Sequence, residues 1–94
     1  MSSSKAVKII VEGRVQGVWF RGWVTQEATE RNLDGWVRNC TDGSVEALFS
    51  GPAADVYDMV LACHQGPPMA RVDVLSEDPA APPDETGFRS LPTF

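Results

Sequence analysis

The chain begins with alternating apolar and polar residues and then changes to a helical period. The segment 5–12 alternates well enough to predict a strand, with Val7, Ile9 and Val11 on one face. From position 19 the apolar residues recur every four positions, which predicts an amphipathic helix. This helix should end near Asn32, because Asn tolerates the left-handed conformation that follows many helices. The side chains expected in the core are Val7, Ile9 and Val11 of the strand and Phe20, Val24 and Ala28 of the helix.

The second half of the pattern predicts a hairpin, another helix and two more strands. The β-like segments 35–40 and 44–50 flank Thr41-Asp42-Gly43, and Asp-Gly in such a place is a strong hairpin signal. A helix should open at Gly51-Pro52 and end at Gly66-Pro67-Pro68. The segment 70–76 is predicted to be a strand, 77–87 an acidic proline-rich loop, and 88–94 an edge strand that Pro92 ends or confines. The buried stripe expected on the second helix consists of Val56, Met59, Val60 and Cys63.

This order of elements, β-α-β-β-α-β with an extra edge strand, predicts an α+β fold. Two helices on one face of an antiparallel sheet form a two-layer split βαβ sandwich. A chain of 94 residues is expected to be one domain. We expect that domain at residues 6–94, after a disordered tail at 1–5 that lacks the apolar segment of a signal peptide. The fold by itself indicates no function.

The charge is uneven along the chain. Net charge is −5, and the excess of acidic residues lies after position 50, where two cations face seven anions. A general binder of nucleic acid or of an anionic membrane needs a positive surface, so neither partner is expected. Cys40 and Cys63 form no recognisable disulfide framework, which favours free thiols in a cytoplasmic protein. We expect a monomer.

Glycines and arginines crowd the segment VEGRVQGVWFRGW, residues 11–23, between the first strand and the first helix. Gly13 and Gly17 permit positive φ and a close approach of the backbone to a ligand. Inward N–H groups and the positive end of a helix bind anions, and Arg21 can fork onto phosphate oxygens. These residues predict a phosphate cradle, although a plain connection with solvated arginines fits them as well. No dinucleotide fingerprint and no Walker motif is present.

Two motifs resemble those of the acylphosphatase family: GRVQGVWFR at 13–21, and GWVRN at 35–39 followed by DGSVE at 42–46. The resemblance implies a ferredoxin-like sandwich that hydrolyses acyl phosphates without a cofactor or metal, with inorganic phosphate as product and competitive inhibitor. It implies that Arg21 holds the phosphate and that Asn39 orients the attacking water. The backbone amides implied for the cradle are those of Val15, Gln16, Gly17, Val18, Trp19 and Phe20. Gly22 and Asn32 depart from the family pattern, away from the chemistry.

The implied chemistry agrees with the residues present. The carboxylate that leaves an acyl phosphate is a weak base, so no general acid is needed. Charge in the transition state of phosphoryl transfer spreads over equatorial oxygens, so catalysis is mainly positioning and electrostatics. Arg21 and a ring of amides can supply the charge, and the Asn39 amide can hold water for direct in-line attack without a covalent intermediate.

Other functions are less well supported by the sequence. A cysteine phosphatase needs Arg six residues after its Cys, where this chain has Glu46 and Met69, and the single His64 belongs to no zinc-like cluster. Asp42 and Glu46 as an acid/base pair would compete with the hairpin interpretation. Two alternatives stay open: a non-catalytic module that binds acyl or carbamoyl phosphate, and a nucleic-acid-binding module. The latter would stack bases on Trp19, Phe20, Trp23 and Trp36.

Overall fold

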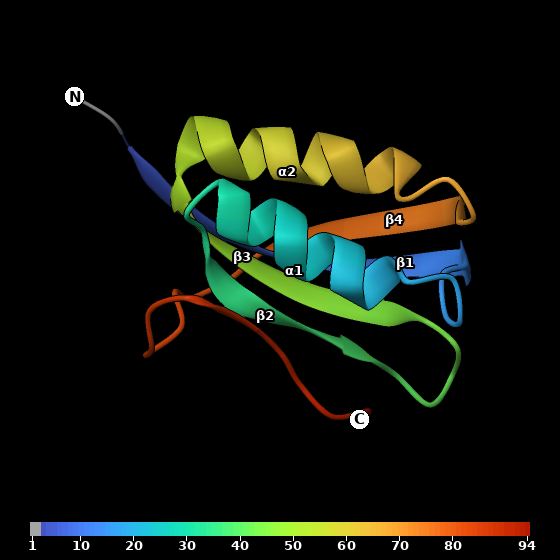
Figure 1. Cartoon of the computed structure of the whole chain (residues 1–94). Helices are drawn as coiled ribbons and strands as arrows, with labels where there is room; N and C mark the ends of the chain where they lie inside the picture. Colours follow the sequence, from blue (N-terminus) through green and yellow to red (C-terminus); the bar gives the residue numbers. More distant parts are fainter. Residues whose placement is uncertain (1–2) are drawn as a thin grey trace.

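The computed structural model describes residues 3–94, in which five strands form one sheet and both helices cover the same face of it (Figure 1). The order of strands across the sheet is β4-β1-β3-β2-β5. The predicted split βαβ sandwich is therefore confirmed. In chain order the elements are β1 Ser4–Arg14, α1 Phe20–Glu30, β2 Asp34–Asn39, β3 Val45–Pro52, α2 Ala53–Gln65, β4 Arg71–Pro79 and β5 Phe88–Ser90.

The sheet departs from the predicted antiparallel arrangement at one edge. The four strands β4, β1, β3 and β2 pair antiparallel, but β5 runs parallel to β2. The reason lies in the loop before β5, which is fastened beside the start of β2. Gly87 N donates to Asp34 Oδ1 at 2.7 Å, and Gly35 N donates to the Gly87 carbonyl oxygen at 3.1 Å. Because β5 starts where β2 starts, the two strands run in the same direction.

The last strand, expected over 88–94, is shorter, because β5 covers only Phe88–Ser90. Three other boundaries differ because a neighbouring strand supplies hydrogen-bond partners. Strand β1 already includes Ser4 and Lys5, which pair with the end of β3, although we expected a tail at 1–5; positions 1 and 2 of that tail lie outside the described residues. Strand β4 continues to Pro79 along β1, so the connecting loop begins at 80 rather than 77. Pro52 is the N-cap of α2, not a residue of its first turn.

The side of the sheet that faces the helices carries the hydrophobic core. All ten side chains predicted for the stripes of the first strand and the two helices are buried. Leu33, Val37 and Phe49 extend this core toward β2 and β3. Asn32 has a φ of 57°, which confirms the left-handed residue expected after α1. None of the helices within residues 3–94 combines the length and apolar character that crossing a bilayer requires.

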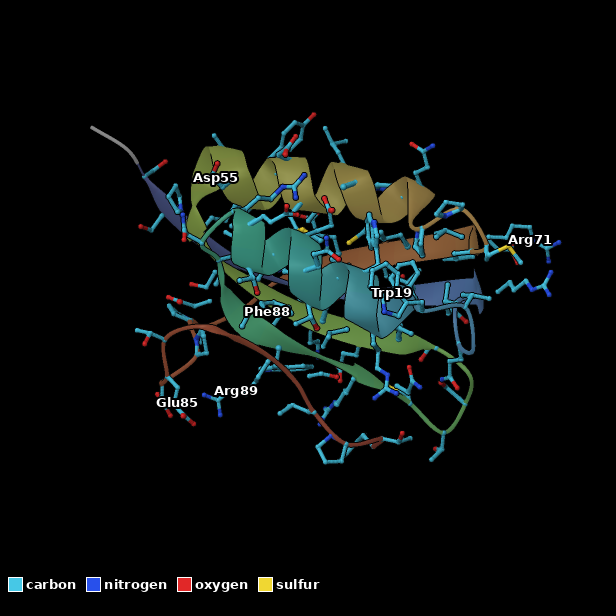
Figure 2. The ribbon with its side chains drawn as sticks, in the orientation of Figure 1. Trp19, Asp55, Arg71, Glu85, Phe88 and Arg89 are labelled. Atoms are coloured by element: carbon cyan, nitrogen blue, oxygen red, sulfur yellow. The ribbon has the colours of Figure 1, made fainter. Side chains whose placement is uncertain are left out.

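Several charged side chains of the sheet and of the acidic loop form ion pairs. On the face opposite the helices, Glu46 is 8% exposed; it accepts a hydrogen bond from Arg38 Nε at 2.8 Å and lies 3.4 Å from Lys8 Nζ. Glu85 and Arg89 form a 2.8 Å ion pair at the opposite end of the molecule from Arg71 (Figure 2). These ion pairs leave few cations free to meet an anionic ligand.

The buried thiol of Cys63 makes the stability of the core depend on pH. Its side chain is 0% exposed in α2, and burial raises its pKa to about 12. The thiol of an unfolded chain ionises near pH ~8.5. Above that pH the unfolded state therefore holds fewer protons than the folded state, and stability decreases as pH rises through this range.

We expect the free energy of unfolding to lose about 1.4 kcal/mol per pH unit through Cys63 above about pH 9. The Cys63→Ala variant lacks this thiol and does not lose stability in this way. The difference in the free energy of unfolding between wild type and variant, measured by urea unfolding, should therefore narrow from about pH 8 to about pH 10. Other titrating groups are common to both proteins and cancel in the difference. A gap that stays constant with pH would contradict the buried neutral thiol.

Candidate active site

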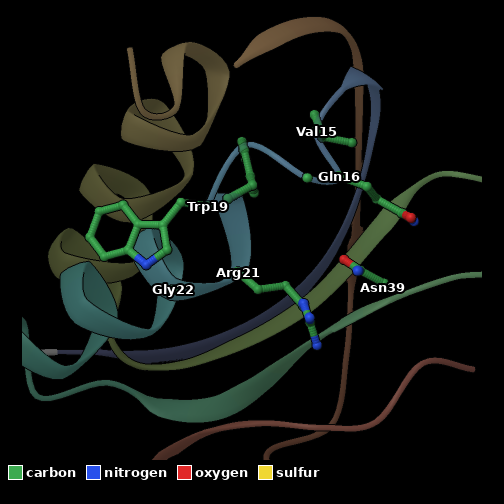
Figure 3. A pocket seen from close by; sticks show the side chains of 8 residues that line it. Val15, Gln16, Trp19, Arg21, Gly22 and Asn39 are labelled. Carbon is green, nitrogen blue, oxygen red and sulfur yellow. The ribbon is translucent and has the colours of Figure 1, made fainter. Parts of the chain in front are cut away.

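The loop between β1 and α1 forms one wall of a cavity of about 180 Å³, and the end of β2 forms another (Figure 3). Arg21 in the first turn of α1 and Asn39 at the end of β2 both line it. The tertiary fold thus brings together two residues from separate motifs of the sequence. The other lining residues are Val15, Gln16, Gly17, Trp19, Phe20 and Gly22. Val18 lies in the same loop, and its side chain packs against the core.

The loop presents a run of backbone N–H groups without protein partners. Among residues 3–94, none of the N–H groups from Val15 to Phe20 donates a hydrogen bond to the protein. Helix α1 begins here with no side-chain cap, and its first turn contains no acidic residue. The partial positive charge of a helix N-terminus is therefore uncompensated at this point. Such a terminus, with a loop of free amides before it, is suited to hold an anion.

The two glycines of the loop have different tasks. Gly17 has a φ of 73° with open space around the place of a Cβ, so it serves the left-handed turn of the backbone. A Cβ on Gly13 would overlap the backbone of Arg71 and Asp73 in β4. Gly13 therefore allows β1 and β4 to approach at the irregularity that follows Glu12. Of the two, Gly17 belongs to the cavity and Gly13 belongs to the sheet.

Trp19 and Gly22 form a local unit that the motifs alone do not explain. Trp19 has a φ of 65°, which is rare for a residue with a bulky side chain. Its indole lies over Gly22, where a Cβ would collide with the indole ring. In Figure 3 the ring points away from the side chains of Arg21 and Asn39. Trp19 therefore contributes backbone to the cavity, and Gly22 is needed for the position of its ring.

The Arg21 guanidinium has no carboxylate partner. Arg31, Arg38, Arg71 and Arg89 each lie within 4.0 Å of an acidic oxygen. In the described part of the chain Arg14 and Arg21 enter no ion pair, and of these two only Arg21 lines the cavity. Its side chain extends across the cavity toward Asn39 (Figure 3). An unpaired planar cation beside free amides is suited to bind two oxygens of a phosphate.

Asn39 carries the one buried polar side-chain atom that lacks a hydrogen-bond partner within residues 3–94, its amide oxygen Oδ1. An unsatisfied buried acceptor costs about 1–3 kcal/mol, so such atoms are rare away from functional sites. The backbone of Asn39 is fixed because it pairs with Val45 across the hairpin. The free Oδ1 is thus a stationary acceptor at the cavity, suited to a water molecule or another donor.

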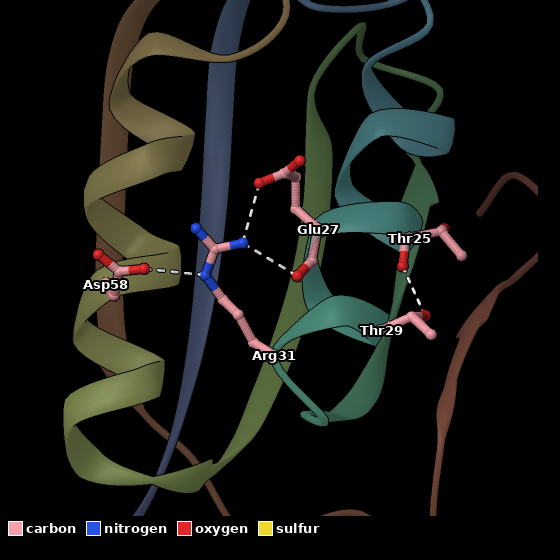
Figure 4. A network of polar contacts seen from close by, with 5 residues as sticks. All are labelled: Thr25, Glu27, Thr29, Arg31 and Asp58. Carbon is pink, nitrogen blue, oxygen red and sulfur yellow. Dashed lines mark hydrogen bonds and ion pairs between the residues drawn. The ribbon is translucent and has the colours of Figure 1, made fainter.

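Polar contacts hold the helix that carries Arg21. Arg31, just after α1, donates to Glu27 Oε1 at 2.9 Å and to Asp58 Oδ2 of α2 at 3.0 Å (Figure 4). Burial lowers the pKa of Arg31, but the hydrogen bonds that it donates to the Glu27 and Asp58 carboxylates outweigh this effect, so the pKa is raised. Arg31 therefore stays charged and links the two helices. Thr25 Oγ1 donates to the Arg21 carbonyl oxygen at 2.9 Å within the first turns.

Gln16 makes contacts that sequence reasoning missed. Its backbone was expected in the cradle, but its side-chain Nε2 also donates to the carbonyl oxygens of Cys40 and Ser44, each at 2.8 Å. These carbonyls belong to the β2–β3 turn. No local pattern in the sequence indicates this contact, because its partners lie 24 and 28 residues away.

The hairpin interpretation of Asp42 is confirmed. Its Oδ1 accepts hydrogen bonds from Ser44 Oγ at 2.6 Å and Ser44 N at 2.9 Å, which hold the pKa of the Asp42 carboxyl below its usual value. Gly43 N donates to the Cys40 carbonyl at 3.1 Å, closing the turn. Glu46 is occupied by Arg38, so the two acids form no catalytic pair. Within residues 3–94, His, Cys, Asp and Glu side chains form no group of three or more suited to a metal ion.

The proposed base-stacking surface does not form as a unit. Phe20 is buried in the core, and its ring lies 5.7 Å from that of Trp23 in a tilted arrangement. Trp36 lies elsewhere, with the Arg38 guanidinium 4.8 Å from its ring centre. Only Trp19 of the four is largely exposed. A platform for successive bases is therefore absent from these residues.

Comparison with known proteins places these features in a family. Residues 7–90 match the family model described as Acylphosphatase. The chain is 52% identical over 90 residues to an acylphosphatase of Rhodospirillum rubrum, covering 96% of this chain and 99% of that one. The acylphosphatase structure from Coxiella burnetii superposes with a TM-score of 0.89 at 32% identity, over 94% of this chain and 93% of the other. The acylphosphatase structure from Bacillus subtilis superposes with a TM-score of 0.87 at 38% identity, over 95% of this chain and 99% of the other.

Replacing Arg21 with Lys should weaken the binding of inorganic phosphate even though the charge is kept. Lysine cannot present the planar fork that holds two oxygens. Loss of one charge-assisted hydrogen bond corresponds to about 1.5–3 kcal/mol, or roughly a 10- to 100-fold higher Kd. Calorimetric titration with phosphate measures this, and Arg71→Lys, at the exposed first residue of β4 and outside the cavity lining, is the matched control. Unchanged binding by Arg21→Lys would contradict the assignment.

Proposed function

This chain belongs to the acylphosphatase family, and we propose that it hydrolyses the carboxyl–phosphate bond of small acyl phosphates to a carboxylate and inorganic phosphate. One observation carries the proposal: backbone amides, a guanidinium and an amide oxygen that have no partner within residues 3–94 meet at a single cavity. The named relatives support the enzyme over the two alternatives, a non-catalytic phosphate-binding module and a nucleic-acid-binding module.

The phosphoryl group is held by the loop and by Arg21. The N–H groups of Val15, Gln16, Gly17, Val18, Trp19 and Phe20 surround its equatorial oxygens, and the Arg21 guanidinium forks onto two of them. Charge builds on these oxygens in the transition state, so fixed donors here lower the barrier most. The support is the uncapped start of α1 and the absence of an ion pair at Arg21 in the described residues.

Asn39 positions the attacking water. Its Oδ1 accepts a hydrogen bond from the water, which directs a lone pair of the water oxygen at phosphorus. The new P–O bond forms as the bond to the acyl oxygen breaks on the opposite side, and the carboxylate leaves with the electron pair. The water proton passes to a phosphate oxygen or to solvent. No covalent intermediate forms, and the free buried Oδ1 supports this role.

The proposed function needs no second domain or subunit. We propose that residues 6–94 form one catalytic domain that works as a monomer in the cytoplasm, with phosphate as product and competitive inhibitor. Cys40 and Cys63 are free thiols, which suits a reducing compartment. No cofactor or metal has a part in this mechanism.

Replacing Asn39 with Ala should abolish most turnover but preserve phosphate binding. The variant loses the water-holding oxygen and keeps the cradle, so kcat should fall on the order of 10²–10³-fold, as for other single positioned polar groups. The inhibition constant of inorganic phosphate, measured in the same assay, should stay near the wild-type value. Equal losses of phosphate affinity and turnover would assign Asn39 to the anion instead of the water.

The choice of leaving group tests the function as a whole. A carboxylate, whose acid has a pKa near ~4, leaves without protonation, whereas an alkoxide does not. The protein should therefore hydrolyse benzoyl phosphate far faster than glycerol phosphate. It should do so equally well in EDTA, because Arg21 and the loop amides take the charge-neutralising role that Mg²⁺ has in kinases. Comparable rates on glycerol phosphate, or a metal requirement after chelation, would overturn the proposal.

A further inference from the structure

The side chain of Gln16 joins the two halves of the site. Its Nε2 donates both of its hydrogens to protein carbonyls, those of Cys40 and Ser44, each at 2.8 Å. Cys40 directly follows Asn39, and Ser44 precedes β3. We propose that this clamp makes Gln16 a positioning residue: it sets the place of Asn39, and so of the attacking water, relative to the bound phosphate. The inference rests on the proposed function.

Core packing of Val15 and Val45 holds the loop near the hairpin, but the clamp supplies the directional contacts between them. Pairing between β1 and β3 ends at Val11 and Val45, before the loop begins. Within residues 3–94, the two bonds from Gln16 are the hydrogen bonds that connect residues 15–19 to residues 39–45. The cradle and the water-holding residue therefore lie on separate elements that one amide group bridges.

The clamp is suited to fix geometry. Ser44 O also accepts the Cys40 N–H at 2.9 Å, so the two carbonyls that Gln16 contacts close the mouth of the same turn. Because the Gln16 amide donates to both carbonyls, it cannot move without shifting the end of β2 and the start of β3. Gln16 is partly buried, so water competes weakly for these bonds. Its backbone N–H stays free for the anion, and one residue thus contacts the phosphate site and the hairpin together.

Geometry of this kind acts on the chemical step. In-line attack needs the water oxygen about 3–3.5 Å from phosphorus, and a misplacement of about 1 Å can cost roughly 10²-fold in rate. Phosphate binding depends on the loop amides and Arg21, which do not require the hairpin. Loss of the clamp should therefore lower kcat and leave phosphate affinity nearly unchanged.

The test uses Gln16→Met, which keeps the length of the side chain and removes both donors. The carbonyls of Cys40 and Ser44 keep their bonds from Gly43 N and Cys40 N, so the fold should persist. With benzoyl phosphate, kcat should fall roughly 10- to 100-fold, while the inhibition constant of phosphate stays within about twofold. Gln26→Met, at an exposed position of α1, is the matched control and should behave as wild type.

A double-mutant cycle separates positioning from a merely structural effect. If Gln16 acts through Asn39, Gln16→Met should lose most of its effect on kcat in the Asn39→Ala background. Thermal unfolding confirms that each variant is folded. Gln16→Asn, whose amide falls one methylene short, carries the same expectation if Gln16→Met does not fold.

The outcomes distinguish the clamp from the function on which it rests. Two results would overturn the positioning role of Gln16 without affecting the proposed hydrolysis. One is a wild-type kcat in the Gln16 variants, and the other is a loss of kcat from Gln16→Met that is as large in the Asn39→Ala background as in wild type. Absence of benzoyl phosphate hydrolysis by the wild-type protein would overturn the proposed function and, with it, the role of Gln16.

Discussion

The site depends on a run of backbone N–H groups that have no protein partner within residues 3–94, and the rest of the structure holds these groups in place. Between Val15 and Phe20 the chain leaves its amides free and begins a helix without a cap, among the residues described. Unpaired donors reduce stability, so an arrangement of this kind persists only where the surrounding structure holds it. An anion is the partner that such a group of amides and a helix terminus favour.

The remainder of the fold holds this loop from several sides. Arg31 fastens α1 to α2 and the close approach at Gly13 sets the end of β1, which hold the two ends of the loop, while the Gln16 side chain holds the hairpin with Asn39 beside it. Each support is a contact between elements that are distant in sequence. The cavity consequently has fixed walls before any ligand enters, which is the condition for electrostatic stabilisation without reorganisation.

Charge pairing elsewhere makes the site selective within an acidic protein. Arg38 and Lys8 face Glu46 on the far side of the sheet, and Arg89 faces Glu85. Arg21 has no such partner in the described part of the chain. A net charge of −5 therefore coexists with a small cationic site, because acids pair with five of the seven cations outside it, Lys8, Arg31, Arg38, Arg71 and Arg89.

Local sequence determined the elements and their buried faces, because periodicity depends only on neighbouring positions. The stripe through Phe20 and Val24, the turn at Asp42 and the left-handed Asn32 could all be read this way, and the motifs pointed to Arg21 and Asn39. Tertiary structure alone decided which contacts cross between elements. The parallel direction of β5, the unpaired Oδ1 of Asn39 and the reach of Gln16 to Ser44 depend on residues far apart in the chain. No local pattern encodes these contacts, because they exist only after the strands have paired.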